Sequence, residues 1–316
     1  KPIMRNALLF LTLAVCPLIG ADSQFNGRWD ITVRNEPRNR AWWLQVEGAG
    51  TPNIKGKFVG FPGGNMNDIQ KIWIKDGELH FTFDRAPLPG KKGGKIHQEY
   101  AARLVGDKLE GTFADGKQKL TWSGMRAPKI TDKDDGSWRE GKPIKLFDGK
   151  DLSGWHGQVT GKQLGWSVKD GILSSTGGAN NLESDQKFWN FKLHLEFRVG
   201  SHSNSGIGLR GRYEAQIMDA PGRPIDIHSM GALYSRIPPS VDASKPAGQW
   251  QTYDIRLVGR QVTLVLNGQK VVQGEIEGLT AVAAGDPNEA LPGPLVLQGD
   301  HGPVDFRNVV LTPLVR

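Results

Sequence analysis

Short runs of alternating apolar and polar residues recur along most of the chain. In each run the apolar side chains stand at every second position, which is the pattern of a strand with one buried face. Such runs include residues 29–34, 79–83, 191–199 and 261–266. The dipeptides Asp76-Gly77 and Asn267-Gly268 each separate two runs and favour tight hairpin turns. The pattern therefore predicts an all-β fold built from antiparallel hairpins.

The spacing of these runs divides the chain into two folded units. About eight short strands between residues 25 and 126 predict a small antiparallel β-barrel, and Gly27-Arg28-Trp29 is similar to the opening of lipocalin-like barrels. Stronger strand signals after the polar linker predict a two-sheet β-sandwich. The predicted organisation is a signal peptide at 1–21, a barrel at 22–126, a linker at 127–142 and a sandwich at 143–316.

The first residues have the composition of a targeting segment. Lys1 and Arg5 precede an uncharged, largely apolar run at residues 7–20. Cleavage by signal peptidase is expected after Ala21. The run is too short to span a bilayer, and no later stretch is apolar enough to do so. We expect a periplasmic or secreted protein, with a lipid anchor at Cys16 left open.

Composition excludes several classes of protein. The 38% hydrophobic content and 10 Trp residues are incompatible with a disordered chain. The net charge is +7, but the basic residues are dispersed, whereas a nucleic-acid groove needs a basic stripe. Cys16 is the single cysteine and lies in the expected leader. We therefore expect no nucleic-acid partner and no disulfide, thiolate metal site or cysteine nucleophile in the mature chain.

The segment at residues 209–219 carries an unusual set of polar side chains. If it is one strand, Arg210, Arg212, Glu214 and Gln216 share one face. A solvated outer sheet face has a similar pattern. A concave sugar-binding cleft explains the set better, because hydroxyls and developing oxyanions need several fixed donors and acceptors.

Histidine and tryptophan add further candidates. The seven histidines form no close metal-type pair. His301 lies in a loop between two strong strand signals, where functional residues are more frequent than within strands, and His228 and His202 are weaker candidates on loops. Trp250 either packs in the core or stacks on the face of a sugar.

Four segments of the second unit together resemble one enzyme family. They are residues 146–155, 204–217, 231–234 and 301–309. This part of the chain, about residues 143–315, resembles the 3-keto-disaccharide hydrolases, also described as 3-keto-glucoside lyase and 3-keto-2-hydroxy-glucal hydratase domains. The resemblance implies a concanavalin-like jelly roll, an exported bacterial setting and a 3-oxo-glycoside substrate.

The resemblance also implies which residues form the site. The family's recurring polar positions correspond to Arg210, Glu214, Gln216, Tyr234 and His301. In the implied reaction a base removes the C2 proton beside the C3 ketone, the C1 substituent leaves, and water adds at C1. Glu214 or His301 is the expected base, Arg210 is expected to hold the enolate or ketone oxygen, and Gln216 and Tyr234 to orient hydroxyls. Arg212 and Trp250 are further substrate-binding candidates.

Asp219 completes the predicted site. The spacing Glu214-x-Gln216-x-x-Asp219 looks like a variant of the Glu-x-Asp-x-x-Glu strand of laminarinase-type jelly rolls. Because Gln216 replaces the middle acid, direct hydrolysis by two carboxylates is disfavoured. Asp219 is instead a possible acid or cation ligand.

The remaining expectations concern cofactors, partners and competing functions. The sequence requires no cofactor, although a divalent cation is possible as a stabiliser. The keto route implies a glucoside 3-dehydrogenase that supplies the 3-keto sugar. The alternatives are a carbohydrate-binding module without catalysis and a surface interaction or structural protein.

Overall fold

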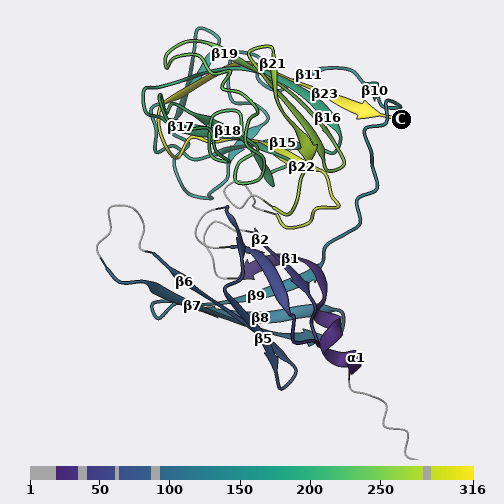
Figure 1. The fold of residues 1–316 in the computed structure, drawn as a ribbon. Coiled ribbons are helices and arrows are strands. Elements are labelled where there is room, and N and C mark those ends of the chain that lie inside the picture. The colour runs from purple at the N-terminus through teal and green to yellow at the C-terminus, as the bar shows by residue number, and fades with distance from the viewer. Residues whose placement is uncertain (1–18, 35–40, 61–63, 87–92, 280–285) are drawn as a thin grey trace, which may run out of the picture.

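The computed structural model describes residues 19–34, 41–60, 64–86, 93–279 and 286–316 of the chain. These residues form two all-β units joined by an extended segment (Figure 1). Most of the expected signal peptide, residues 1–18, lies outside the described residues. The described part includes the short helix α1 (Ile19–Asp22) and a 3-10 turn, η1 (Ser23–Phe25), ahead of the first strand.

The N-terminal unit is an antiparallel sheet that has nine strands within the described ranges. Their order is β4-β3-β2-β1-β9-β8-β7-β6-β5, so β1 pairs with β9, and β4 and β5 are the ends of the order. The lipocalin-like detail stays a prediction. The strands are β1 (Gly27–Arg34), β2 (Ala41–Glu47), β3 (Lys55–Val59), β4 (Met66–Asp68), β5 (Lys71–Lys75), β6 (Glu78–Arg85), β7 (Ile96–Val105), β8 (Lys108–Ala114) and β9 (Lys119–Arg126).

Aromatic side chains fill the buried face of this curled sheet. The ring centroid of Trp42 lies 5.7 Å from that of Phe58 and 5.8 Å from those of Tyr100 and Phe113, all in edge-to-face geometry. Each such pair adds about 0.5–1.5 kcal/mol to the stabilisation from area burial. The unit therefore has an aromatic core of its own.

The C-terminal unit is a jelly-roll β-sandwich of two antiparallel sheets, as the sequence predicted. One sheet has the order β12-β15-β22-β17-β18, and the other has the order β13-β14-β23-β16-β19-β20-β21, with β10 and β11 also paired to β23. The strands are β10 (Arg139–Glu140), β11 (Ile144–Lys145), β12 (Trp155–Gly157), β13 (Trp166–Lys169), β14 (Ile172–Ser175), β15 (Leu182–Phe188), β16 (Phe191–Val199), β17 (Asn204–Leu209), β18 (Tyr213–Met218), β19 (Gln251–Val258), β20 (Gln261–Leu266), β21 (Gln269–Glu275), β22 (Gly293–Leu297) and β23 (Val304–Val315).

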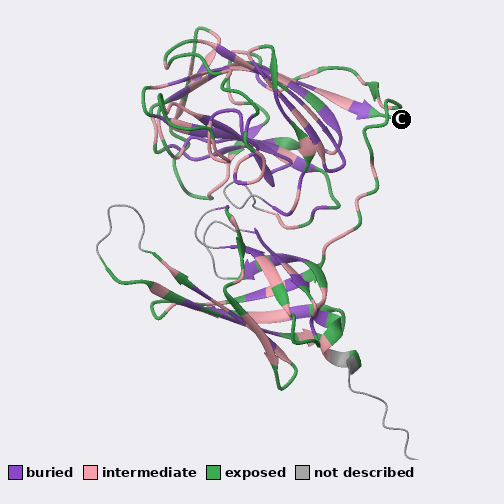
Figure 2. Ribbon diagram, in the orientation of Figure 1, coloured by how far each residue is buried: buried purple, intermediate pink, exposed green. Residues whose placement is uncertain are grey.

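The core of the sandwich follows the predicted alternation. Along β16 every second side chain is buried against the other sheet, while those between them face outward. The buried set on β16 is Phe191, Leu193, Leu195, Phe197 and Val199. The hairpin turn at Asn267 and Gly268, with φ of 50° and 82°, is also as predicted. Figure 2 shows the buried residues concentrated between the sheets.

The segment at 127–142, predicted as a polar linker, contacts the sandwich. The Asp132 Oδ2 atom accepts hydrogen bonds from Trp189 Nε1 at 2.7 Å and from Asn190 Nδ2 at 2.9 Å. Further along, β10 pairs with β23. The segment therefore lies along the sandwich before the chain enters it.

The two units share a packed interface. Trp43 and Val59 of the N-terminal unit belong to the same buried apolar cluster as Ile276 and Leu279 of the sandwich. Each of these four side chains is at most 2% exposed. Because this apolar surface is removed from water only when the units are together, its burial favours their association.

Two buried carboxyl groups meet at this interface. The backbone N–H of Glu289 donates to Asp30 Oδ2 over 3.5 Å. The Glu289 carboxylate accepts hydrogen bonds from Tyr213 Oη at 3.0 Å and from Arg260 Nη2 at 2.9 Å. Burial, and next the Glu289 carboxyl, raises the pKa of Asp30 to about 8. Asp30 is therefore protonated in the folded protein at neutral pH.

Asp30→Asn is expected to reduce the pH dependence of stability. The folded protein keeps a proton on Asp30 that an unfolded Asp releases near pH 4. The contribution of this proton to the free energy of unfolding is therefore full below about pH 4. It is lost as pH rises toward about 8, by at most about 1.4 kcal/mol per pH unit. Urea unfolding between pH 5 and pH 8 should show a flatter profile for Asp30→Asn. The exposed-turn variant Asp107→Asn is the control, and equal slopes for Asp30→Asn and wild type would contradict the assignment.

Candidate active site

Glu214 and Gln216 project from β18 on the side opposite the core. On one side of the strand, β17 places Gly208 opposite Glu214 and Gly206 opposite Gln216. A Cβ atom at Gly206 would lie 2.3 Å from Glu214 Oε1, so glycine is needed there for the carboxyl group to fit. On the other side, the backbone N–H of Tyr234 donates to the Glu214 carbonyl at 2.9 Å. Strand pairing therefore brings Glu214, Gln216 and Tyr234 together, as expected.

Glu214 is a buried carboxyl group with few hydrogen-bond partners. Its side chain is 3% exposed, and Oε2 has no hydrogen-bond partner among the described residues. With its amide turned to donate, Gln216 Nε2 lies 3.0 Å from Glu214 Oε1 and 3.1 Å from the Ser205 carbonyl. Burial, and next the charge of Asp300, raises the pKa of Glu214 to about 8. Glu214 is therefore protonated at neutral pH and can act as a proton donor.

An Asp–His pair stands beside Glu214. In the loop between β22 and β23, His301 Nδ1 lies 2.7 Å from Asp300 Oδ1. The Asp300 side chain is 13% exposed and that of His301 is 49% exposed. Asn181 Oδ1 accepts the backbone N–H groups of Gly299 at 2.9 Å and Asp300 at 3.3 Å, which fixes the loop. Asp300 thus joins the predicted residues Glu214 and His301.

Tyr234 and His228 form the next part of the cluster. Their ring centroids are 5.0 Å apart in edge-to-face geometry. Burial, and next the Glu214 carboxyl, raises the pKa of the Tyr234 hydroxyl, so this group stays a hydrogen-bond donor at neutral pH. The cluster combines a protonated acid, an Asp–His pair and a phenol, which is enough for proton transfer in two directions.

The prediction that Arg210 and Arg212 share the Glu214 face is wrong. Residues 210–212 form the tight turn between β17 and β18, with φ of +52° at Arg210 and a bond from the Arg212 N–H to the Leu209 carbonyl. Both side chains are at most 1% exposed. Arg210 donates to the Trp189 and Gly259 carbonyls and to Asn190 Oδ1, and Arg212 pairs with Asp286. Both guanidinium groups therefore tie loops to the sandwich and do not face a substrate.

Arg210→Met is expected to reduce stability rather than substrate binding. The change leaves three buried acceptors without the donors at 2.6, 2.8 and 3.0 Å. A loss of about 3 kcal/mol in the free energy of unfolding is expected from hydrogen bonds to a charged group. Below the unfolding transition the KM should stay within about twofold of wild type. A raised KM with unchanged stability would restore the substrate-binding role.

The structure also places Trp250 away from Glu214. Trp250 lies just before β19, and its ring contacts the guanidinium groups of Arg307 at 4.0 Å and Arg198 at 4.8 Å. Both arginines come from strands of the other sheet, β23 and β16. The ring contacts of Trp250 are therefore with these two arginines and not with the Glu214 cluster, and its role in substrate binding stays a prediction.

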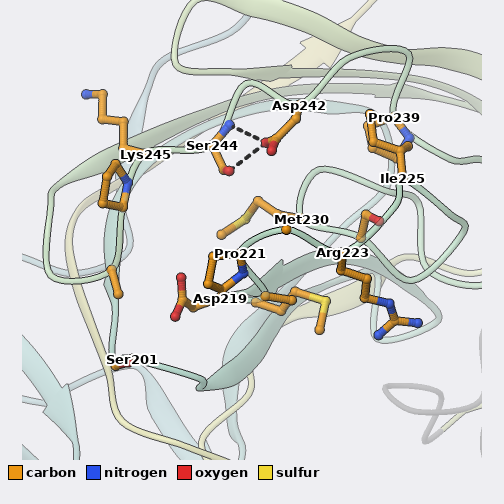
Figure 3. A pocket seen from close by; sticks show the side chains of 16 residues that line it. Ser201, Asp219, Pro221, Arg223, Ile225, Met230, Pro239, Asp242, Ser244 and Lys245 are labelled. Atoms are coloured by element: carbon orange, nitrogen blue, oxygen red, sulfur yellow. Dashed lines mark hydrogen bonds between the residues drawn. The ribbon is translucent and has the colours of Figure 1, made fainter.

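Asp219 lies past the end of β18 and does not pair with Glu214. Asp219 is five positions after Glu214, which corresponds to roughly 16 Å between their Cα atoms along an extended chain. Paired glycosidase carboxyls are about 5–9.5 Å apart. Asp219 accepts the His202 backbone N–H at 2.8 Å and lines a cavity of about 630 Å³. Figure 3 shows its carboxylate in this cavity.

The cavity adjoins the Glu214 cluster through Met218. Glu214 is not among the lining residues, whereas Met218, Arg223 and Lys245 are. The terminal amide group of Gln216 approaches Met218 Sδ to 3.9 Å. The open space therefore begins two strand positions beyond Gln216, and we place the chemistry at Glu214 because the titratable groups gather there.

No group of three or more His, Cys, Asp or Glu side chains is arranged to hold a metal ion among the described residues. Across the described part of the chain, no helix has the length and apolar character needed to cross a membrane. The divalent cation stays a prediction.

Sequence comparison identifies a related family. The family described as the 3-keto-alpha-glucoside-1,2-lyase-like domain matches residues 142–312. A curated protein named 3-keto-disaccharide hydrolase, from Bacteroides thetaiotaomicron, is 25% identical over 169 residues. That match spans 41% of this chain and 57% of the relative.

Two solved structures from Parabacteroides distasonis, both provisionally described as glycosyl hydrolases, are also similar. One is 26% identical with a TM-score of 0.48 and covers 59% of this chain and 99% of its own. The other is 25% identical with a TM-score of 0.44 and covers 54% of this chain and 98% of its own.

Proposed function

Over residues 142–312 the chain belongs to the family of 3-keto-alpha-glucoside-1,2-lyase-like domains, and we propose on that premise that it cleaves 3-keto-disaccharides. The overall reaction is a hydrolysis that proceeds by elimination and then hydration. A glucoside 3-dehydrogenase supplies the substrate, and the enzyme acts in the periplasm or outside the cell. A carbohydrate-binding module is less well supported, because binding alone does not need a buried, protonated acid beside an Asp–His pair.

The observation that carries the proposal is that a proton donor, Glu214, lies near a proton acceptor, His301. Glu214 holds a proton at neutral pH because its pKa is raised to about 8. His301 bonds through Nδ1 to Asp300 at 2.7 Å, which places the basic lone pair on Nε2. When the surroundings keep one group protonated and leave a neighbouring group able to accept a proton, the first can act as the acid and the second as the base.

The steps follow from these assignments. His301 removes the proton from C2, which the C3 ketone acidifies, and the electron pair moves onto the C3 oxygen. The Tyr234 hydroxyl donates to that oxygen in place of Arg210. The C1–O bond then breaks as Glu214 protonates the departing oxygen, giving an unsaturated 3-keto sugar. Glu214 then takes a proton from water as the water oxygen bonds to C1, and His301, whose proton exchanges with solvent, protonates C2. This gives the 3-keto sugar and restores both residues.

The substrate needs a route to the buried acid. Glu214 is 3% exposed, so the reacting ring must enter beside Tyr234, which is half-buried. The cavity of about 630 Å³ that begins at Met218 offers room for the rest of the disaccharide. Exclusion of water around Glu214 strengthens its interaction with the departing oxygen.

The proposal is tested by incubation of the enzyme with 3-keto-trehalose in deuterated water. Elimination followed by hydration puts deuterium on C2 of the released 3-keto-glucose, and free 3-keto-glucose without enzyme controls for spontaneous exchange. Release without deuterium would indicate direct hydrolysis, and binding without release would indicate a binding module. Parallel reactions with trehalose and with EDTA test the need for the ketone and for a divalent cation.

A further inference from the structure

The N-terminal sheet contains a hollow of about 340 Å³. It lies where β3 and β4 meet the end of β6 and the start of β7. The lining combines the aromatic rings of Phe58 and Tyr100 with the amides of Asn65 and Gln98 and the guanidinium group of Arg85. Ligand sites in proteins have volumes of about 300–1,000 Å³ and often occupy the mouths of curled sheets.

Buried polar groups line the inner part of this hollow. Gln98 and Tyr100 are each 2% exposed, and both lie on the inward face of β7. The Tyr100 hydroxyl has no hydrogen-bond partner within the described ranges. A buried polar group without a partner costs about 1–3 kcal/mol, so its presence in a hollow of ligand size indicates a group that a ligand completes.

Asn65 connects the hollow to the catalytic unit. Its side chain lines the hollow, and its Oδ1 atom accepts hydrogen bonds from His228 Nε2 at 2.9 Å and from Ser235 Oγ at 2.8 Å. The neighbouring Gly64 carbonyl accepts from Arg236 Nη1 at 3.0 Å. These residues flank Tyr234, so the hollow adjoins the segment that covers Glu214.

We propose that this hollow binds one ring of a neutral saccharide and extends the catalytic site across the two units. Amides, the Tyr100 hydroxyl and a guanidinium group supply the donors and acceptors that sugar hydroxyls need. Asp68 and Asp84 line the hollow together with Arg85, so its charges favour a neutral ligand over an acidic one. The choice of a saccharide, but not the existence of the site, rests on the proposed function.

The test is calorimetric titration of the full chain with trehalose, which has no ketone and is not turned over. Tyr100→Phe removes one hydroxyl and should weaken binding by about threefold to tenfold, whereas Arg85→Ala should weaken it by about tenfold or more. The matched control is Arg103→Ala on the outer face of β7, which should bind as wild type does.

The outcomes separate this site from the proposed catalytic function. Weaker binding in Tyr100→Phe and Arg85→Ala supports the site, whether or not 3-keto-trehalose is cleaved. Equal affinity of wild type, Tyr100→Phe and Arg85→Ala would overturn it. Tighter binding of glucuronate than of trehalose would overturn the assignment to a neutral saccharide. Thermal unfolding of Tyr100→Phe should occur at the wild-type temperature or above it, because the hydroxyl it lacks is buried and makes no hydrogen bond with the described residues.

Discussion

Glu214→Gln is expected to lower kcat for 3-keto-disaccharide cleavage by about 10²–10⁴-fold, the usual contribution of a positioned acid or base. Glutamine has the shape of a protonated glutamate but carries no proton that it can release. The substituted amide therefore cannot protonate the departing oxygen. Substrate binding should change little, so the loss should appear in kcat and not in KM. Steady-state kinetics with 3-keto-trehalose measure both.

The same variant separates catalysis from folding. Because the pKa of Glu214 is raised to about 8, the wild-type residue is uncharged at pH 7, and the stability of Glu214→Gln should equal or exceed that of wild type. Wild-type activity should fall above about pH 8, where Glu214 loses its proton. A kcat within tenfold of wild type, in a folded variant, would remove Glu214 from the mechanism.

The regular parts of the fold could be predicted from sequence because they depend on local signals. Alternation along residues 191–199 matches the buried and outward positions of β16. The Asp76-Gly77 pair adopts positive φ angles of 53° and 72° in the β5–β6 hairpin, as an Asp-Gly turn requires. In both cases the nearest neighbours in sequence determine the conformation.

The prediction for Arg210 and Arg212 was wrong because the pattern of alternation does not reveal a turn. The alternating pattern continues through Gly211 in the sequence, whereas in the structure Gly211 adopts a φ of +62° in the β17–β18 turn. Gly211 is the residue in this segment that could have indicated a turn. Once the chain reverses there, the alternation that places Glu214 and Gln216 on one face does not apply to the two arginines.

Contacts between distant segments do not follow from the local pattern of the sequence. Asp300 influences Glu214 only because the loop after β22 folds beside β18, and no spacing in the sequence encodes that approach. Likewise, Asn65 lies 163 residues before His228 yet bonds to it. The neighbouring Asp300 and His301 offered one clue, since an Asp beside a His can orient its ring.

The Asp300–His301 pair leads to the second large expected effect. His301→Ala should lower kcat by about 10²–10⁴-fold if His301 removes the C2 proton, and loss of deuterium exchange at C2 should accompany it. Asp300→Asn should also be strongly impaired, because an amide no longer selects the required tautomer of His301. The matched control is His194→Ala, which removes an exposed histidine that bonds to Asp254 at the same 2.7 Å on the other sheet.

Two further measurements show whether Asp300 acts through its neighbours. If it works by orienting His301, the double variant Asp300→Asn/His301→Ala should be no slower than His301→Ala, because residues that act as a unit are not additive. Asp300 also raises the pKa of Glu214 by its charge. Its removal should therefore lower that pKa and move the loss of activity at high pH to a lower pH. Additive losses with an unmoved pH profile would show that Asp300 has no part in positioning His301 or in keeping Glu214 protonated.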